Sequence, residues 1–441
     1  MDNSYSYYSE KLTRAGLAEV GAPLLGAGEE IIASKGQAPK KNVDGSTIAM
    51  PGTGKDLIAA KRQAPPKTTD GATMEMPETG AGLMAWNRKD PLTNLLAKVG
   101  DRLGRRTILY SQPAEPYHTM LLHLTETADG GDVIHPQDFE TRIFLKDLPI
   151  LKDLTEAGLL AALKDRRCAI IPGGGVIATA KKDMETAFVI YSAACFAVFV
   201  KFFSDLLRQR QHSGPSWKGW AVLETIMGRL DPVLPVAAGL TLSSGPWEDE
   251  ADIRAAMAAA GKRTVADRLV DANFGNISYR RGEDLFITRK GSALDALADR
   301  IIRVPLEGPA DTDAIASTEL PAHRLIALTA PYLAVLHGHP KFSVIMSMAC
   351  GEEDCPDRGG CHRFCPRERW IQDIPVVSGE AGAGPFGLCN TVPKAVRDHG
   401  AAIVYGHGVF TAGAQDFNEA LQRLWQIEKT CRDLFFQMIG S

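Results

Sequence analysis

The sequence lacks the features of membrane, secreted and nucleic-acid-binding proteins. Its longest apolar run, Ala187 to Val200, is interrupted by Ser192 and is too short to span a bilayer, so it indicates a buried helix. The first residues, Met1 to Tyr5, have neither the basic nor the apolar region of a secretory signal. A net charge of -4 and a pI near 6.2 offer no electrostatic basis for binding nucleic acid or anionic membrane. We therefore expect a cytoplasmic protein.

Cysteine is scarce as well, and the common nucleotide-binding loop is missing. Eight cysteines in 441 residues do not make a disulfide scaffold and indicate reduced thiols. The segment Gly52 to Lys55 lacks the first glycine and the Lys-Ser/Thr ending of a P-loop. A hydrophobic content of 45% allows more than one sizeable core, and the length suggests two or three domains.

Histidine carries the strongest signal in the chain. His337 and His339 follow an apolar run, and His407 stands between two glycines about seventy residues later. Alternate residues of a strand face the same side, so the first two imidazoles can converge on one cation. Three protein ligands with an open fourth position are typical of a catalytic zinc. Taken alone, the pair also fits two hydrogen-bonded core histidines.

Three upstream segments strengthen the metal interpretation. The segments are Gly275-Asn276-Ile277-Ser278-Tyr279-Arg280, Ile287-Thr288-Arg289-Lys290-Gly291-Ser292, and Ser317-Thr318-Glu319 followed by His323. Together with the histidines they resemble the class II aldolase/adducin family, which includes zinc-dependent fuculose-phosphate and rhamnulose-phosphate aldolases, from about Arg263 to Gly440. The resemblance implies a three-layer α/β/α domain with a central, mainly antiparallel sheet, a Zn²⁺ or other divalent cofactor, and a homo-oligomer.

Five polar residues of these segments are candidates for substrate binding. Their amides, hydroxyls and open backbone suit a phosphate or carboxylate, and in the resemblance they bind the substrate's phosphate. Arg289 and Lys290 depart from the family's loop, which leaves the identity of the anion open; a plain polar turn is the alternative. The five are Asn276, Thr288, Gly291, Ser317 and Thr318.

Glu319 is the candidate acid/base. The resemblance implies a carboxylate beside the metal, and a glutamate near zinc and apolar walls is expected to titrate close to neutrality. The alternatives are a capping-box residue or a solvated helix residue, and His323, one turn on, is also consistent with packing.

An internal repeat divides the rest of the chain. Residues 169–176 align without gaps on residues 402–409, and the register continues into a long helix. Gly174 stands where the second copy has His407. We therefore expect residues 90–213 to form a degenerate, non-catalytic domain related to the catalytic domain at 214–441.

Residues 1–89 form a segment of a different kind. Two copies of a Lys-, Pro-, Gly- and Thr-rich sequence recur there at a spacing of 26 residues, a composition that buries little. These repeats are interpreted as an extended segment that wraps the enzyme, as docking elements for a partner, or as a plain linker. A short amphipathic helix is expected around Leu12 to Leu25.

A cysteine-rich insertion separates the metal histidines. The density of cysteines in this insertion suggests a second, structural zinc or, as a weaker alternative, an iron-sulfur cluster. The spacings between the cysteines match no standard signature, and free thiols or a disulfide are the other interpretations. The insertion stands where it could cover the site or line it with its nearby arginines for an anionic substrate. Its cysteines are Cys350, Cys355, Cys361 and Cys365.

These patterns predict a metal-dependent aldolase that cleaves a small phosphorylated or carboxylated ketose by a retro-aldol reaction. Sugar-phosphate dehydratases and 4-epimerases of the same family share the metal triad, and glutamate rather than aspartate at position 319 favours aldolase or dehydratase. Adducin-like members are interaction modules, but retention of the three histidines and Glu319 argues against that function here.

Overall fold

The structure is a computed structural model. It describes residues 2–18, four short strands between residues 25 and 49, and residues 91–105, 107–128, 131–171, 173, 175–213, 218–230, 242–271, 273–352 and 354–440. Most of the 26-residue repeat, and Gly174, lie outside the described residues.

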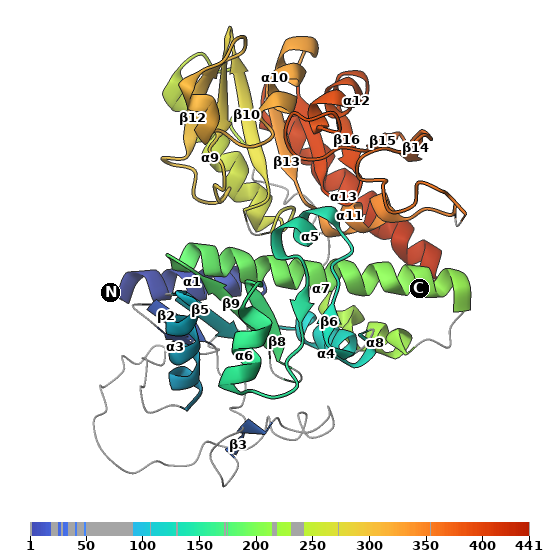
Figure 1. Cartoon of the computed structure of the whole chain (residues 1–441). Helices are drawn as coiled ribbons and strands as arrows, with labels where there is room; N and C mark the ends of the chain where they lie inside the picture. The colour runs from blue at the N-terminus through green and yellow to red at the C-terminus, as the bar shows by residue number, and fades with distance from the viewer. Residues whose placement is uncertain are drawn as a thin grey trace. The chain divides into compact units, whose positions relative to one another are not determined.

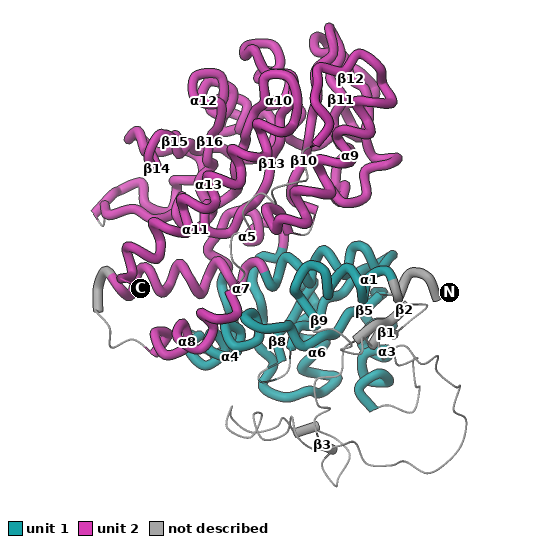
Figure 2. The backbone as a smooth tube through the Cα atoms, turned by 180° about the vertical axis from the view of Figure 1, so that it is seen from behind, with its two compact units in different colours: residues 1–135, 145–195 teal, residues 136–144, 196–441 magenta. Residues whose placement is uncertain are grey.

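The chain divides into two compact units. One holds residues 1–135 and 145–195, and the other holds residues 136–144 and 196–441 (Figure 2). The units do not coincide with the expected segments 1–89, 90–213 and 214–441. That division was drawn from sequence repeats rather than from packing, and it stays a prediction.

An eight-stranded sheet forms the centre of the second unit (Figure 1). All of its neighbouring pairs are antiparallel except β15 and β16. The expected central, mainly antiparallel sheet is therefore confirmed. In order across the sheet, the strands are β12 (Ile301–Pro305), β11 (Asp284–Thr288), β10 (Asn276–Arg281), β13 (Ala334–Gly338), β17 (Val409–Gly413), β16 (Ala401–Val404), β15 (Ile374–Val377) and β14 (Arg369–Ile371).

Helices cover both faces of this sheet, which makes the expected three layers. Apolar residues of α10 and α12 pack on the face that carries Val335 and Phe410, and α9 and α13 pack on the other face. Because both faces are covered, all five residues of β13 are buried. The helices are α5 (Phe139–Leu145), α8 (Gly219–Ile226), α9 (Glu250–Ala266), α10 (Leu320–Thr329), α11 (Lys341–Met348), α12 (Val392–His399), α13 (Phe417–Ile439), and the 3₁₀ helices η4 (Met227–Arg229), η5 (Asp311–Ile315) and η6 (Leu388–Asn390).

A five-stranded sheet of order β1-β2-β5-β9-β8 forms the first unit. Leu12 and Leu17, in and just after its first helix, are fully buried, so the N-terminal segment is not extended throughout, and its helix lies earlier than expected. The elements are α1 (Asp2–Arg14), β1 (Leu25–Ala27), β2 (Glu30–Ala33), α3 (Pro91–Leu103), β5 (Thr107–Ser111), α4 (Tyr117–Thr127), β6 (Val133–Ile134), β7 (Leu148–Pro149), α6 (Glu156–Leu163), β8 (Cys168–Ile171) and β9 (Gly175–Ala180), beside the separate hairpin β3 (Lys40–Lys41) and β4 (Ile48–Ala49).

A strand, a turn and a long helix were expected twice in the chain and are present twice, each copy with a second strand after the turn. The hairpin β8–β9 is followed by α7 (Met184–Ser213), as β16–β17 is followed by α13. In the register of the sequence repeat, β8 coincides with β16 and the first residue of α7 with the first residue of α13. The secondary structure therefore supports a common origin for the two segments.

Helix α7 is longer than the apolar run suggested. Residues Met184–Arg210 are long and apolar enough to cross a membrane by length and composition, but 89% of the most apolar stretch is buried within the protein. Burial of this kind is typical of a core helix, as the sequence indicated.

Candidate metal centre

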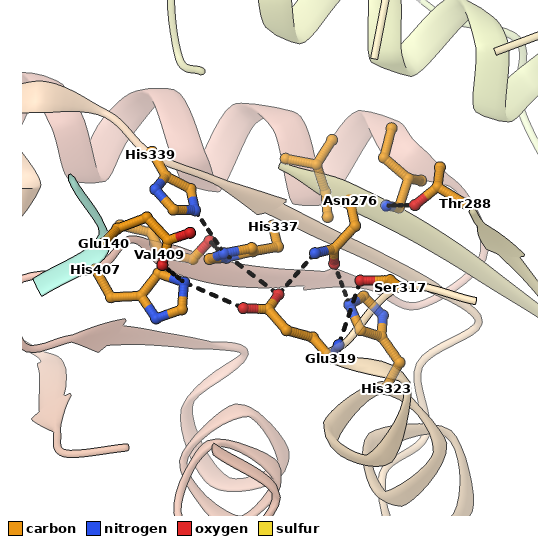
Figure 3. Close-up of polar contacts among 12 residues, drawn as sticks. Glu140, Asn276, Thr288, Ser317, Glu319, His323, His337, His339, His407 and Val409 are labelled. Carbon is orange, nitrogen blue, oxygen red and sulfur yellow. Dashed lines mark hydrogen bonds and ion pairs between the residues drawn. The ribbon is translucent and has the colours of Figure 1, made fainter. Parts of the chain in front are cut away.

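Three buried histidines meet where β13 ends. His337 lies in β13, opposite Asn276 of β10 and Phe410 of β17, and His339 follows the end of the strand. His407 lies in the turn between β16 and β17. The Nε2 atoms of His337 and His339 are 2.9 Å apart, and the potential ligand atoms of all three residues lie within 4.8 Å of one another (Figure 3). The structure therefore brings the predicted triad together.

The surroundings of the triad suit a metal. The Nδ1 atom of His337 lies 3.0 Å from the carbonyl oxygen of Val409, which can only accept, so Nδ1 carries the proton and Nε2 keeps its lone pair. Burial, aided by repulsion from His407 and opposed by Glu319, lowers the pKa of His337 to about 4. Burial also holds the pKa of His339 well below its ordinary value. Neutral imidazoles are the form that binds zinc and similar divalent ions, so His337 and His339 fit such a metal directly. Although burial lowers the pKa of His407, its contacts with Glu319 and Glu140 raise it to about 9, so this ring binds a metal on losing its proton.

Glu319 faces the triad from the first turn of α10. Its Oε1 lies 3.1 Å from Nε2 of His407, and its Oε2 lies 3.4 Å from Nε2 of His337. It occupies the N-cap position, yet its side chain makes no capping hydrogen bond, so the capping-box alternative is wrong. Burial favours the neutral carboxyl, but His337, His407 and Asn276 outweigh it and hold the pKa of Glu319 below its ordinary value. These contacts therefore favour the ionised carboxylate.

A chain of hydrogen bonds fixes this carboxylate. The side-chain amide of Asn276 donates to Oε2 of Glu319 at 2.7 Å, and its Oδ1 lies 2.5 Å from Nε2 of His323. The other ring nitrogen of His323 lies 2.7 Å from Oγ of Ser278. Since the amide oxygen can only accept, Nε2 of His323 carries the proton, and burial keeps this ring neutral by lowering its pKa to about 3. His323 is thus a positioning residue rather than apolar packing.

The five candidate anion-binding residues lie beside this chain. The segments after β11 and before α10 run together, since the backbone N–H of Ser317 donates to the carbonyl oxygen of Thr288 at 3.0 Å. Asn276, Thr288 and Ser317 are buried, whereas Gly291 and Thr318 are exposed. Gly291 has φ of 71°, a conformation that favours glycine. The structure thus groups these residues, and their role in binding stays a prediction.

Glu140 joins the site although no sequence motif points to it. Its Oε2 lies 3.7 Å from Nε2 of His407 (Figure 3), and the backbone N–H of Phe139 donates to the carbonyl oxygen of Gly406 at 2.8 Å, which anchors α5 there. Burial raises the pKa of Glu140. His407 opposes this increase, and repulsion from Glu319 adds to it. The region 90–213, expected to be non-catalytic, therefore supplies a carboxylate to the metal centre.

The cysteines of the insertion do not assemble a second site. Within the described part of the chain, the histidine triad is the group found with metal-ligand spacing, and all four cysteines are partly buried free thiols. A structural zinc or an iron-sulfur cluster at Cys350, Cys355, Cys361 and Cys365 therefore has no geometric support here.

Part of the chain is similar to known proteins. Residues 255–435 match the family model for the Class II Aldolase and Adducin N-terminal domain. Among solved structures, L-fuculose-1-phosphate aldolase from Thermus thermophilus is 26% identical over 43% of this chain and 95% of that one, with a TM-score of 0.34. YgbL from Klebsiella pneumoniae, described as a putative aldolase/epimerase/decarboxylase, is 22% identical over 43% and 91%, with a TM-score of 0.35. No curated protein matches the chain.

The family assignment rests on the match to the family model, which spans the strands and helices that carry Asn276, Glu319 and the three histidines. Class II aldolases are generally dependent on a divalent metal, which agrees with the buried triad. Residues 255–435 therefore form a domain of the class II aldolase and adducin family.

Proposed function

We propose that this chain is a zinc-dependent aldehyde-lyase that cleaves a small phosphorylated or carboxylated ketose by a retro-aldol reaction. One observation carries the proposal: the buried carboxyl group of Glu319 contacts His337 and His407 and is held in place by Asn276. A buried carboxylate fixed beside three potential metal ligands fits proton transfer next to a metal-bound substrate better than a purely structural role.

The chemistry needs a base and a site for negative charge. In a retro-aldol cleavage, a base removes the proton of the hydroxyl β to the carbonyl, the intervening carbon–carbon bond breaks, and an aldehyde leaves. The electron pair remains on the ketone fragment until a proton returns to carbon. A divalent metal held by His337, His339 and His407 would stabilise that negative charge as a Lewis acid.

The protein side chains supply the remaining steps. Glu319, ionised and held by Asn276, is placed to accept the hydroxyl proton and to return a proton to carbon. Thr288 and Ser317, in the segments beside it, supply hydroxyls for the anionic group of the substrate. Glu140 adds a second carboxylate near Nε2 of His407, the nitrogen that Glu319 also contacts.

A product assay tests this proposal. The zinc-loaded protein should release an aldehyde from at least one member of a panel of phosphorylated and carboxylated ketoses, and a chelator should abolish the release. Glu319→Gln should keep the metal and lose on the order of a hundredfold in kcat, because an amide cannot exchange the proton. A dehydrated ketone would indicate a dehydratase and an inverted sugar a 4-epimerase. An unchanged kcat in the variant would remove Glu319 from the mechanism.

A further inference from the structure

A second polar cavity lies in the same unit, apart from the histidine triad. It has a volume of about 240 Å³ and is bounded by α5, α7, α11, the cysteine-rich insertion and the turn that precedes His407. Pockets for drug-sized ligands occupy roughly 300 to 1,000 Å³, so this one suits a smaller metabolite. Neither the family match nor the proposed reaction accounts for it.

The wall of this cavity is basic. Arg142 of α5, Arg208 of α7 and Arg358 of the insertion line it, and no carboxylate is among the described residues that do so. Two neighbours orient Arg208. Its Nη2 donates to Oε1 of Gln137 at 3.1 Å, and its Nη1 lies 3.5 Å from Oδ1 of Asp205. Three guanidinium groups from three separate segments are brought to one cavity, which is the arrangement that favours an oxyanion.

Neutral donors complete the lining. The hydroxyl oxygen of Ser204 is buried and has no hydrogen-bond partner in the described part of the chain, although it lies in the cavity wall. A buried hydroxyl without a partner costs free energy, and a ligand oxygen would satisfy it. His362, stacked on Phe139 at 4.3 Å between ring centroids, adds an imidazole to the wall. Burial, Arg142 and Arg363 lower the pKa of His362, so this ring offers a neutral N–H.

We propose that this cavity binds an oxyanion group, phosphate or carboxylate, of a small metabolite through Arg142, Arg208, Arg358 and the hydroxyl of Ser204. The site is separate from the segment of Thr288 and Ser317, so it does not depend on the reaction proposed above. Helix α5 serves both sites, because Phe139 and Arg142 line the cavity while Glu140 faces His407. An anion bound there ties α5 to α7 and to the insertion.

Calorimetric titration of the full, zinc-loaded chain tests the proposal. Inorganic phosphate and succinate are titrated separately, so the two arms distinguish a phosphate site from a carboxylate site. At least one of them should bind with a stoichiometry near one per chain. The double variant Arg142→Gln/Arg358→Gln should weaken that binding by about a hundredfold, since each charge-assisted hydrogen bond is worth about a factor of ten. Ser317→Ala should leave the same binding in place, because that residue lies outside the cavity.

Arg397→Gln is the matched control, because it removes one exposed arginine of the same unit that pairs with Asp398 outside the cavity. It should leave the affinity unchanged. If the double variant does not fold, as judged by circular dichroism, the single change Arg142→Gln at an exposed position replaces it, with an expected loss of about tenfold. Absence of binding of both anions to the wild-type protein would overturn the proposal. Equal binding in the cavity variant and in Arg397→Gln would overturn it too.

Discussion

Replacing Gly408 with alanine tests how closely the backbone packs around the metal centre. A Cβ atom at this position would lie 2.4 Å from the carbonyl oxygen of Gly338, 2.8 Å from Cε1 of His337 and 3.0 Å from Cδ2 of His339. The backbone must move by about 0.6 Å to relieve the first contact, whereas metal–ligand distances tolerate about 0.2 Å. We expect Gly408→Ala to weaken zinc binding by about tenfold to a hundredfold.

Competition with a chromophoric chelator measures this loss. Overpacking of this kind costs about 1–3 kcal/mol of unfolding free energy, so the variant should still fold and show a lower melting temperature. Gly351→Ala is the control, because a Cβ there meets nothing within 4 Å. If Gly408→Ala bound zinc as tightly as the wild type does, the proposed convergence of the imidazoles beside this glycine would be refuted.

Three further predictions concern the site and the core. Burial lowers the pKa of His407, but contacts with Glu319 and Glu140 outweigh burial and raise the pKa to about 9. Because the ring must lose its proton to bind a metal, the apparent zinc affinity should rise about tenfold per pH unit up to about pH 9. A flat profile between about pH 6 and 8 would contradict this. His323→Gln should lower kcat by about tenfold or more, because it disturbs the hydrogen bond to Asn276, the residue that holds Glu319. The zinc affinity in the chelator assay should stay unchanged. Leu12→Ala should lower the unfolding free energy by about 2–5 kcal/mol in urea titrations, because Leu12 is fully buried. The zinc affinity should not change, because Leu12 belongs to the other unit. A zinc affinity that fell together with the stability would contradict the independence of the metal centre from that unit.

The metal triad could be predicted because local rules place it. His337 and His339 alternate on a strand, and a glycine-flanked turn presents His407, so a short stretch of sequence fixes each ligand. The layers of the domain were predicted from the family resemblance of its motifs, and the repeat of residues 169–176 at 402–409 marks corresponding hairpins.

Glu140 and the basic cavity could not be predicted, because both depend on contacts between distant segments. Glu140 stands in no recognisable motif, and only the packing of α5 against the turn at Gly406 brings it to His407. The low pKa of Glu319 was likewise missed, since it reflects three partners gathered around one carboxylate. In the cysteine-rich insertion, cysteine density indicated a metal site, but density alone does not bring the side chains to metal-ligand spacing, and the site stays a prediction.

Zinc-edge X-ray absorption on the chain loaded with one equivalent of zinc tests the central claim most directly. If His337, His339 and His407 hold the metal, the first shell should contain nitrogen or oxygen neighbours at about 2.0–2.1 Å, with imidazole scattering beyond it. Substituting His407 with alanine should weaken the imidazole scattering. A first shell dominated by sulfur at about 2.3 Å would place the metal on the cysteine-rich insertion and contradict the account.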